Sequence, residues 1–504
     1  MPEPDTFPVE PRATPASSSA VDEEAPTTDR GFGRLVRHSA LYATGAALGK
    51  VIGLLLLPIV ARSLTTTEFG RVDLLTSIQS AGASLLLLGM DLAATRLFAD
   101  LNETSKQRLF PTWLSMVATL GTAAIVGMVV VAAPLSRWLF GDGDYATALV
   151  LAAVAMLANA VGLVALTALR NHQRPVAFAL VSGGNLLVNG ILIVVLVPSH
   201  PTATTVLFSL AASMTFGALA GTVLAISYFR GRPQASIGRR LLILGLPLAP
   251  AVAAMWIAEV VNRTVLIRST SASEAAFFSV ATRFSSVVVL VVLGFQMAWE
   301  PAAFGSAHDD EDLAHIAQDG RRIMTGVGLA VVLAAVTAPE VVRIIGGSAY
   351  GPAIRPIGLS LVFALGYGGY MVATMPSALS RHMRDLGIAA SVAAVTGIVL
   401  NLWMARWGAS GTAGAVAAGQ FVGLALAVYL GRQRAPVPYL WLRMSGLVLV
   451  AAGVATLATW PSGGASVALR VVLAVGFIAV FTVEGSLRDL SGALTERFVR
   501  RPTG

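Results

Sequence analysis

The sequence of 504 residues contains no cysteine. It therefore has no disulfide bond, no thiolate metal site and no cysteine nucleophile. Charged side chains are also scarce, because Asp, Glu, Lys and Arg make up only 12% of the residues, whereas a soluble domain has about a quarter. With 55% apolar residues and a mean hydropathy of +0.74, this scarcity excludes a soluble enzyme, a disordered protein and a disulfide scaffold. The composition indicates a membrane protein with many spans.

The first thirty residues differ from the rest of the chain. Residues 1–30 are acidic and rich in Pro, Ser and Thr, so they have too little apolar surface to fold. They also lack the basic segment and apolar core of a secretory signal. We expect a disordered, solvated tail on the cytoplasmic side of the membrane.

Apolar runs recur along the remainder of the chain. Crossing a bilayer core about 30 Å thick takes roughly 20 apolar residues in a helix, and about fourteen runs of this length are present. They lie at approximately 38–63, 72–99, 109–133, 146–169, 176–197, 204–228, 241–268, 275–300, 322–345, 352–377, 386–406, 409–430, 445–460 and 466–486. The sequence therefore predicts an all-α integral membrane protein with about fourteen transmembrane helices.

Basic residues predict the orientation of these spans. The formal net charge is +8, and nearly every second gap between apolar runs is rich in Arg, as in the cluster Arg230, Arg232, Arg239 and Arg240. Such alternation is typical of cytoplasmic loops that face anionic lipid, rather than of a nucleic-acid groove. We expect a multi-pass protein of the plasma (inner) membrane with both termini in the cytoplasm.

A faint internal repeat divides the chain. Arg62-Ser63 with Glu68, and Arg268-Ser269 with Glu274, share the pattern R-S-x-x-x-x-E. Six spans followed by six indicate two pseudo-symmetric six-helix bundles, with two extra C-terminal helices. We expect an N-lobe at 31–230, a C-lobe at 231–430, and a segment at 431–504 with the last two helices and a basic cytoplasmic tail. Transporter sites usually lie between such repeats.

Four basic residues fall inside the apolar runs. A charge in mid-membrane costs at least about 2.5–3.5 kcal/mol, so it needs a functional or structural reason. Lys50 and Arg283 lie deep in their spans, whereas Arg96 and Arg263 lie nearer the ends, where a long side chain reaches the interface. We interpret the four as candidates for lining a water-filled cavity that attracts anions.

Two acids in the runs have competing interpretations. Glu259 precedes Arg263 by four positions, so mutual neutralisation on one helix face is the simpler interpretation. Asp91 and Arg96 are five positions apart and do not face each other well. The alternative is that Asp91 or Glu259 couples transport to a proton or sodium ion.

Other polar and aromatic features predict structure rather than chemistry. His308 and His315 lie in an acidic stretch with no third ligand at a diagnostic interval, so we expect a solvated helix, no metal and no cofactor. The external loops, of about ten residues, leave little room for a catalytic domain, and we expect no enzyme. Trp113, Trp138 and Tyr350 lie near span ends and are expected to anchor at the interface.

Longer stretches carry a resemblance to a known family. SALYATGAALGKVIGLLLLPIVARSLTTTEFGRVDLLTSIQS, followed by GMDLAATRLF, resembles the start of the Wzx-like oligosaccharide flippases of polysaccharide biosynthesis. That family belongs to the multidrug/oligosaccharidyl-lipid/polysaccharide exporter superfamily. GLPLAPAVAAMWIAEVVNRTVLIRSTSASEAAFFSVATRF, running on to GFQMAWEPAAF, looks like the same family's seventh and eighth helices. The likeness covers roughly residues 35–430.

The resemblance implies a function for the cavity. Such proteins carry a polyprenyl-diphosphate-linked oligosaccharide from the cytoplasmic to the outer leaflet by alternating access, and line the cavity with basic residues. This role corresponds here to Lys50, Arg96, Arg263 and Arg283. A proton or sodium coupling ion, and glycosyltransferases or a polymerase as partners, are implied in the same way. The family commonly has an acid before the basic residue of the seventh helix, whereas Asn262 precedes Arg263 here and Glu259 is the nearby acid.

Three other functions stay open as alternatives. A drug exporter on the same scaffold is expected to have acids and aromatics in its cavity, and the bases argue against it. A lipid II flippase carries a closely related substrate. A membrane glycan polymerase or ligase needs a large external loop, which the sequence lacks.

Overall fold

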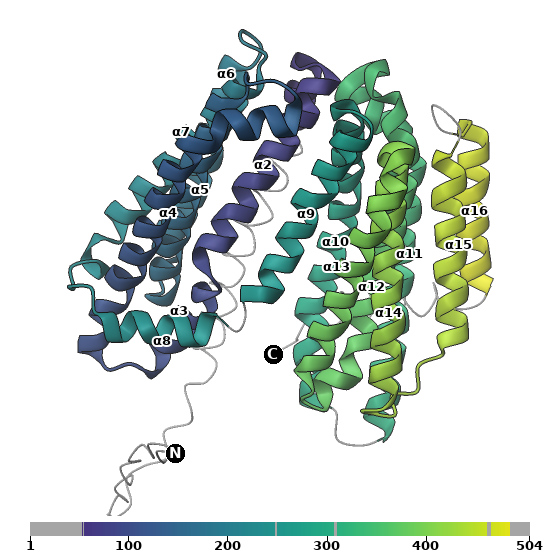
Figure 1. The fold of residues 1–504 in the computed structure, drawn as a ribbon. Helices are drawn as coiled ribbons and strands as arrows, with labels where there is room; N and C mark the ends of the chain where they lie inside the picture. The colour runs from purple at the N-terminus through teal and green to yellow at the C-terminus, as the bar shows by residue number, and fades with distance from the viewer. Residues whose placement is uncertain (1–52, 54, 247–248, 307–309, 461–464, 484–504) are drawn as a thin grey trace, which may run out of the picture.

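The structure is a computed structural model that describes residue 53 and residues 55–246, 249–306, 310–460 and 465–483. Within these ranges every regular element is a helix (Figure 1). Residues 55–63 are helical, and three short 3₁₀ segments, Ile226–Tyr228, Gly347–Ala353 and Ala405–Trp407, join longer helices. The α-helices are α2 (Thr66–Leu87), α3 (Met90–Asp100), α4 (Glu103–Phe140), α5 (Ala146–Asn171), α6 (Pro175–Leu196), α7 (Ala203–Leu224), α8 (Ala235–Gly245), α9 (Ala249–Ser269), α10 (Ala272–Ser306), α11 (Asp310–Gly346), α12 (Ile354–Leu379), α13 (Met383–Met404), α14 (Gly408–Arg432), α15 (Trp441–Thr459) and α16 (Val467–Val483).

The helices match the predicted membrane spans. Eight stretches of the described chain are long and apolar enough to cross a membrane, and two of them, Glu311–Leu379 and Met383–Arg432, each contain two α-helices. Val467–Thr482 is a shorter apolar helix. Together with α2 and α9, these coincide with thirteen of the predicted runs. Of the run at 38–63 the structure describes residue 53 and residues 55–63, and residues 55–63 are helical. The prediction of an all-α membrane fold is confirmed.

Two predicted runs are broken. The run at 72–99 divides into α2 and α3 because Leu88 and Gly89 adopt left-handed backbone angles, with φ of 48° and 70°, and such angles end a right-handed helix. The run at 241–268 begins in α8 and continues in α9. Pro247 lies between these two helices in the sequence, and proline cannot donate the backbone hydrogen bond of a helix interior.

The helices gather in two lobes (Figure 1). In the first lobe α5 packs against α2, α4 and α7, and α6 against α7; in the second α14 packs against α12 and α13, and α12 against α10 and α11. Helices α15 and α16 lie outside the second lobe, where both contact α11. Helix α8 lies within the predicted C-lobe range, 231–430, but it packs against α3 and α4 of the first lobe. The lobe boundary at residue 230 stays a prediction.

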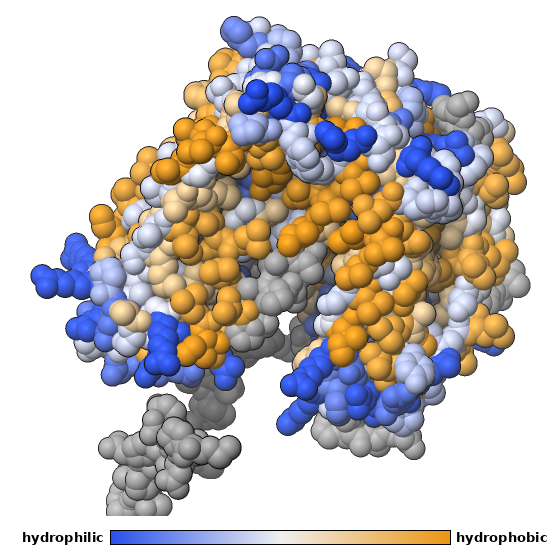
Figure 2. All heavy atoms as spheres, viewed as in Figure 1, coloured by the Kyte–Doolittle hydropathy of each residue, from blue (hydrophilic) through white to orange (hydrophobic). Residues whose placement is uncertain are grey.

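The surface has the polarity of a membrane protein. On the face that Figure 2 shows, a broad apolar band crosses both lobes, with hydrophilic residues concentrated at the two ends. Exposed apolar side chains such as Val130, Leu187 and Leu449 contribute to this kind of surface, which in water would aggregate. Of the three expected interfacial anchors, Trp138 is exposed, but Trp113 and Tyr350 are buried. The expectation is wrong for these two, because Trp113 packs in the core of the first lobe and Tyr350 packs between the lobes, against Phe69 of α2 and Phe277 of α10.

The sequence repeat corresponds to a structural one. Glu68, in the first turn of α2, accepts a hydrogen bond from the backbone N–H of Ala203, where α7 begins. Glu274, in the first turn of α10, accepts one from the backbone N–H of Ala409 in the first turn of α14. Both bonds join residues 135 positions apart. Each acid thus ties the beginning of one helix to the beginning of another, because a helix N-terminus presents unpaired N–H donors and attracts negative charge.

Glu68 also organises the connection between α4 and α5. The Tyr145 hydroxyl donates to this carboxylate, and the Arg71 guanidinium contacts both groups. Burial, together with the hydrogen bond to Glu68, raises the pKa of Tyr145 to about 12. The phenol therefore stays protonated at neutral pH and remains a donor to Glu68.

The lobes meet where α2 and α10 begin, which we call the α2–α10 end. There the hydroxyls of Thr66 and Thr67 each lie 3.0 Å from the Ser273 hydroxyl. Arg62 donates to the carbonyl of Ile344 in the second lobe, and Arg268 donates to the carbonyl of Trp138 in the first, both at 2.5 Å. The two arginines thus form reciprocal bonds across the interface. At the opposite end, where α3 and α8 lie, the lobes are splayed apart in Figure 1.

Close helix packing in the second lobe is testable at Gly419. A Cβ atom there is expected to lie 2.5 Å from the Ala393 carbonyl oxygen and 2.6 Å from the Gly397 nitrogen on α13. Both are backbone atoms, so α13 and α14 have to separate. We expect Gly419→Ala to lower the free energy of unfolding by about 1–3 kcal/mol, measured by thermal denaturation of the purified protein in detergent.

Gly127 on α4 is the matched control, because nothing lies within 4 Å of its added Cβ. Gly127→Ala is expected to leave stability unchanged or to raise it by up to about 1 kcal/mol through helix propensity. Equal effects of the two substitutions contradict the packing described here.

Candidate functional site

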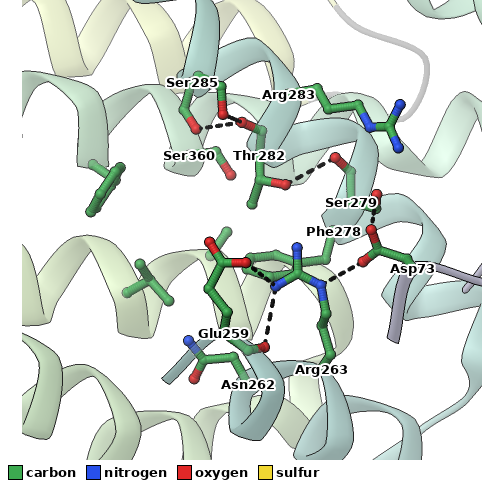
Figure 3. A pocket seen from close by; sticks show the side chains of 14 residues that line it. Asp73, Glu259, Asn262, Arg263, Phe278, Ser279, Thr282, Arg283, Ser285 and Ser360 are labelled. Atoms are coloured by element: carbon green, nitrogen blue, oxygen red, sulfur yellow. Dashed lines mark hydrogen bonds and ion pairs between the residues drawn. The ribbon is translucent and has the colours of Figure 1, made fainter. Parts of the chain in front are cut away.

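A cavity of about 340 Å³ lies at the interface of the lobes. Its lining comes from α2 of the first lobe and from α9, α10, α12 and α14 of the second. Glu259, Asn262 and Arg263 reach it from one face of α9, since positions three and four apart share a helix face. By the same spacing, α10 contributes Ser286 and also Ser279, Thr282 and Arg283, which Figure 3 labels.

Arg263 is held by two carboxylates in this cavity. Its Nε donates to Asp73 Oδ2 at 2.6 Å, and its Nη1 lies 3.5 Å from Glu259 Oε2. Only 8% of Arg263 and 7% of Asp73 is exposed, so the pair with Asp73 is buried. The predicted pairing of Glu259 with Arg263 is present, but the shorter and less exposed ion pair is with a residue of the other lobe.

Asp73 joins three helices. One carboxylate oxygen accepts from Arg263 on α9, and the other accepts from the Ser279 hydroxyl on α10 at 2.6 Å. Asp73 and Ser279 are 206 positions apart, as are Thr67 and Ser273 at the α2–α10 end. Each bond therefore links corresponding positions of the two repeats. Removing one partner of such a buried pair costs about 3–5 kcal/mol, because the other charge is left uncompensated.

Arg283 is held differently. Its guanidinium carbon lies 5.5 Å from the centre of the Phe69 ring, and within the described residues no carboxylate oxygen lies within ion-pair distance of it. Figure 3 shows this side chain on the same helix as Ser279, with no dashed contact. Arg283 therefore has a cation–π contact, and its guanidinium makes no hydrogen bond to another residue of the described ranges.

Arg283 also borders a second cavity. This cavity, of about 330 Å³, is lined by first-lobe residues that include Asp73, Gln79 and Asn189. Asp73 and Arg283 line both cavities. The two residues thus lie between the first-lobe cavity and the interface cavity. An anion in either cavity can therefore contact the Arg283 guanidinium.

The formal charges of the interface cavity cancel. Arg263 and Arg283 carry two positive charges, and Asp73 and Glu259 carry two negative ones. The described part of this site is therefore not simply positive. An anion binds most favourably here if it contacts Arg283 or if it replaces a carboxylate as the partner of Arg263. In either case the guanidinium can bind two phosphate oxygens in a bidentate manner.

The other predicted site residues lie elsewhere or outside the described chain. Arg96 and Asp91 are exposed on α3, and neither lines the two cavities above. The Asp91 backbone carbonyl accepts from Thr95 on the same helix. Lys50, His308 and the tail at 1–30 lie outside the described residues.

Sequence reasoning missed Asp73. The signal is present in the sequence, because Asp73, like Asp91, is a carboxylate within the apolar run at 72–99. Its partner was not predictable in the same way, since Arg263 lies 190 positions away and no local spacing connects the two.

Comparison with known proteins places the fold. No curated protein matches the sequence. The structure is similar to the lipid II flippase MurJ in an inward closed conformation, with a TM-score of 0.68 and 11% identity over 92% of this chain and 100% of that one. It is also similar to an inward-facing multidrug resistance MATE family transporter of the MOP superfamily. The TM-score is 0.66, with 18% identity over 79% of this chain and 95% of that one.

A third similar structure is a MOP superfamily transporter from Pyrococcus furiosus, described as having a binding pocket of reverse polarity. Its TM-score is 0.55, at 17% identity over 82% of this chain and 96% of that one. At these identities the likeness shows the shared fold, a two-lobed bundle of membrane helices. The family described as "Polysaccharide biosynthesis protein" matches residues 35–305, more than half of the sequence. The chain belongs to this polysaccharide biosynthesis family and has the fold of MurJ and the MATE transporters.

Proposed function

We propose that the protein is a flippase that moves a polyprenyl-diphosphate-linked oligosaccharide from the cytoplasmic to the outer leaflet. The observation that carries the proposal is Arg283, a guanidinium without a carboxylate partner among the described residues, on the wall of the cavity between two lobes. Family membership and a transporter fold support it. Arg263 is the second proposed substrate-binding residue of this cavity, and Lys50 and Arg96 remain predictions.

The chemistry of the substrate fits such a cavity. A diphosphate with attached sugars cannot cross hydrocarbon alone, because its charges and hydroxyls lose their water. Guanidinium donors in a hydrated cavity replace that solvation. The polyprenyl chain meanwhile stays in the bilayer. No covalent step is needed, so we propose conformational exchange rather than catalysis.

Counter-ion exchange is the proposed link between binding and movement. A diphosphate that contacts Arg283 lies close to Arg263, which is held across the lobe interface by Asp73. Transfer of Arg263 from Asp73 to the phosphate removes one bond between the lobes without leaving the guanidinium unpaired. Glu259 and Asp91 remain candidates for coupling to a proton or sodium ion, and the half-exposed Glu259 carboxylate is the one at the cavity.

The proposed orientation makes the α3–α8 end cytoplasmic. Arg239 and Arg240 are exposed on α8 at that end, and basic residues are retained on the cytoplasmic side of membranes. With both termini cytoplasmic in a plasma (inner) membrane, the α2–α10 end faces outward and its interlobe bonds close the outer side. Glycosyltransferases or a polymerase are the partners expected for such a substrate.

A lipid II-type flippase is the second candidate. The structural similarity to MurJ extends over 92% of this chain, and lipid II carries the same diphosphate. The cavity site serves either substrate, so the two are separated by comparing transport of lipid II with transport of other polyprenyl-diphosphate oligosaccharides. A drug exporter is expected instead to transport cations, which the Arg283 guanidinium, without a carboxylate partner among the described residues, disfavours.

Arg283→Ala is expected to reduce flipping at least about tenfold, because a charge-assisted hydrogen bond contributes about 1.5–3 kcal/mol. The measurement is leaflet-resolved transport of a fluorescent polyprenyl-diphosphate oligosaccharide in proteoliposomes. Arg283→Lys keeps the charge but loses the bidentate geometry, so an intermediate rate is expected. Arg137→Ala, at an exposed position near the end of α4, is the control and should transport like the unaltered protein. Full activity of Arg283→Ala contradicts the assignment.

Alternating access is testable by cross-linking, because the chain has no native cysteine. The hydroxyls of Thr67 and Ser273 lie 3.0 Å apart across the lobes, so Thr67→Cys with Ser273→Cys should form a disulfide on oxidation. Loss of maleimide labelling reports the cross-link. We expect transport to stop after oxidation and to return on reduction, while either single variant is unaffected by oxidant. Continued transport by the fully cross-linked protein contradicts a mechanism that opens this end.

A further inference from the structure

The second lobe contains another cavity, of about 360 Å³, between α9, α12, α13 and α14. We propose that it binds the first sugar of the lipid-linked substrate, the sugar bonded directly to the diphosphate. This inference rests on the proposed function above. The residues on which it depends are Glu259, Asn262, Phe363, Tyr367, Tyr370 and Gln420. Its volume lies within the range of small-molecule sites, about 300–1,000 Å³.

The position of the cavity fits a substrate with two chemical parts. Glu259, Asn262, Phe363 and Val416 line both this cavity and the one that contains Arg263 and Arg283. The two spaces therefore share a wall. In a glycosyl diphosphate the sugar is covalently next to the phosphate, so a sugar site has to adjoin the anion site. This cavity meets that requirement.

Its aromatic side chains suit the apolar faces of a sugar ring. The rings of Phe363 and Tyr367 are stacked, with centroids 6.4 Å apart and planes 27° apart. The Tyr370 hydroxyl donates to the Leu386 carbonyl at 2.8 Å, which positions its ring in the wall. Aromatic rings in a pocket provide large rigid apolar surfaces, against which the C–H faces of a pyranose pack.

Its polar groups suit sugar hydroxyls. Asn262 is only 8% exposed, and its side-chain oxygen is buried without a hydrogen-bond partner among the described residues. An unpaired buried acceptor costs about 1–3 kcal/mol, and a sugar hydroxyl can donate to it once the carboxamide turns toward the cavity that Asn262 lines. Glu259 and Gln420 add a carboxylate and a second carboxamide to the lining. These polar groups disfavour the alternative occupant, a polyprenyl chain, because the chain offers them no hydrogen bond.

Helix α13 leaves space for the ring. It lines the cavity with small side chains, namely Gly387, Ala390, Ser391, Ala393, Ala394 and Gly397. Aromatic residues of α12 lie on another side of the space. Specificity for the first sugar therefore depends on α12 and on the polar side chains of α9 and α14.

The experiment compares binding of polyprenyl diphosphate with and without one sugar. Purified protein is titrated with the bare lipid and with three glycosylated forms that carry glucose, galactose or N-acetylglucosamine. The readout is the ratio of the bare Kd to the glycosylated Kd. We expect this ratio to be about tenfold for at least one sugar, and Tyr367→Leu to reduce it to near one. Tyr367→Phe, which keeps the ring, should recover most of it.

Tyr429→Leu is the matched control, because Tyr429 is 62% exposed on α14 and lies outside the cavity lining. It should leave both Kd values unchanged. A ratio near one for all three sugars in the unaltered protein overturns the sugar site but leaves the flippase proposal standing. Equal weakening of both lipids by Tyr367→Leu also overturns it and indicates a chain-binding or structural role. Absence of binding by every diphosphate lipid refutes the proposed function itself, and the sugar site with it.

Discussion

The buried ion pair between Asp73 and Arg263 is the constraint on which the rest of the site depends. It joins α2 of one lobe to α9 of the other at 2.6 Å, and Ser279 of α10 completes the carboxylate's hydrogen bonds. Breaking such a buried pair is costly unless a new partner replaces the old one. The lobes can therefore separate cheaply here only when another anion takes over Arg263, which gives substrate binding a physical connection to movement.

The fold repeats, but the charges that line the interface cavity do not. Residues 206 positions apart occupy corresponding places, as the contacts of Asp73 with Ser279 and of Thr67 with Ser273 indicate. By that correspondence Arg263 matches Leu57 and Arg283 matches Ser77. The second lobe thus carries the cations and the first lobe carries the acid that holds one of them. This asymmetry places the proposed anion site at the interface, next to a second-lobe cavity with aromatic walls.

Much of this arrangement was predictable from the sequence. Fourteen apolar runs, the repeat around Glu68 and Glu274, and the unusual intramembrane Arg263 and Arg283 all follow from composition and local spacing. The break at Leu88–Gly89 depends on two left-handed residues. The partnership of Asp73 with Arg263 depends on helix packing across 190 positions, which periodicity within one helix cannot reveal. For the same reason the exposure of Arg96 and the burial of Trp113 became known only from the fold.

Counter-ion competition at Arg263 is the central claim, and the affinity of Asp73→Asn for bare polyprenyl diphosphate tests it most directly. The substitution keeps the size of the side chain and a hydrogen-bond acceptor but removes the charge that competes with the ligand. If the carboxylate and the diphosphate compete for one guanidinium, the variant should bind the lipid several-fold more tightly than the unaltered protein. Unchanged or weaker binding by a folded Asp73→Asn protein contradicts the account.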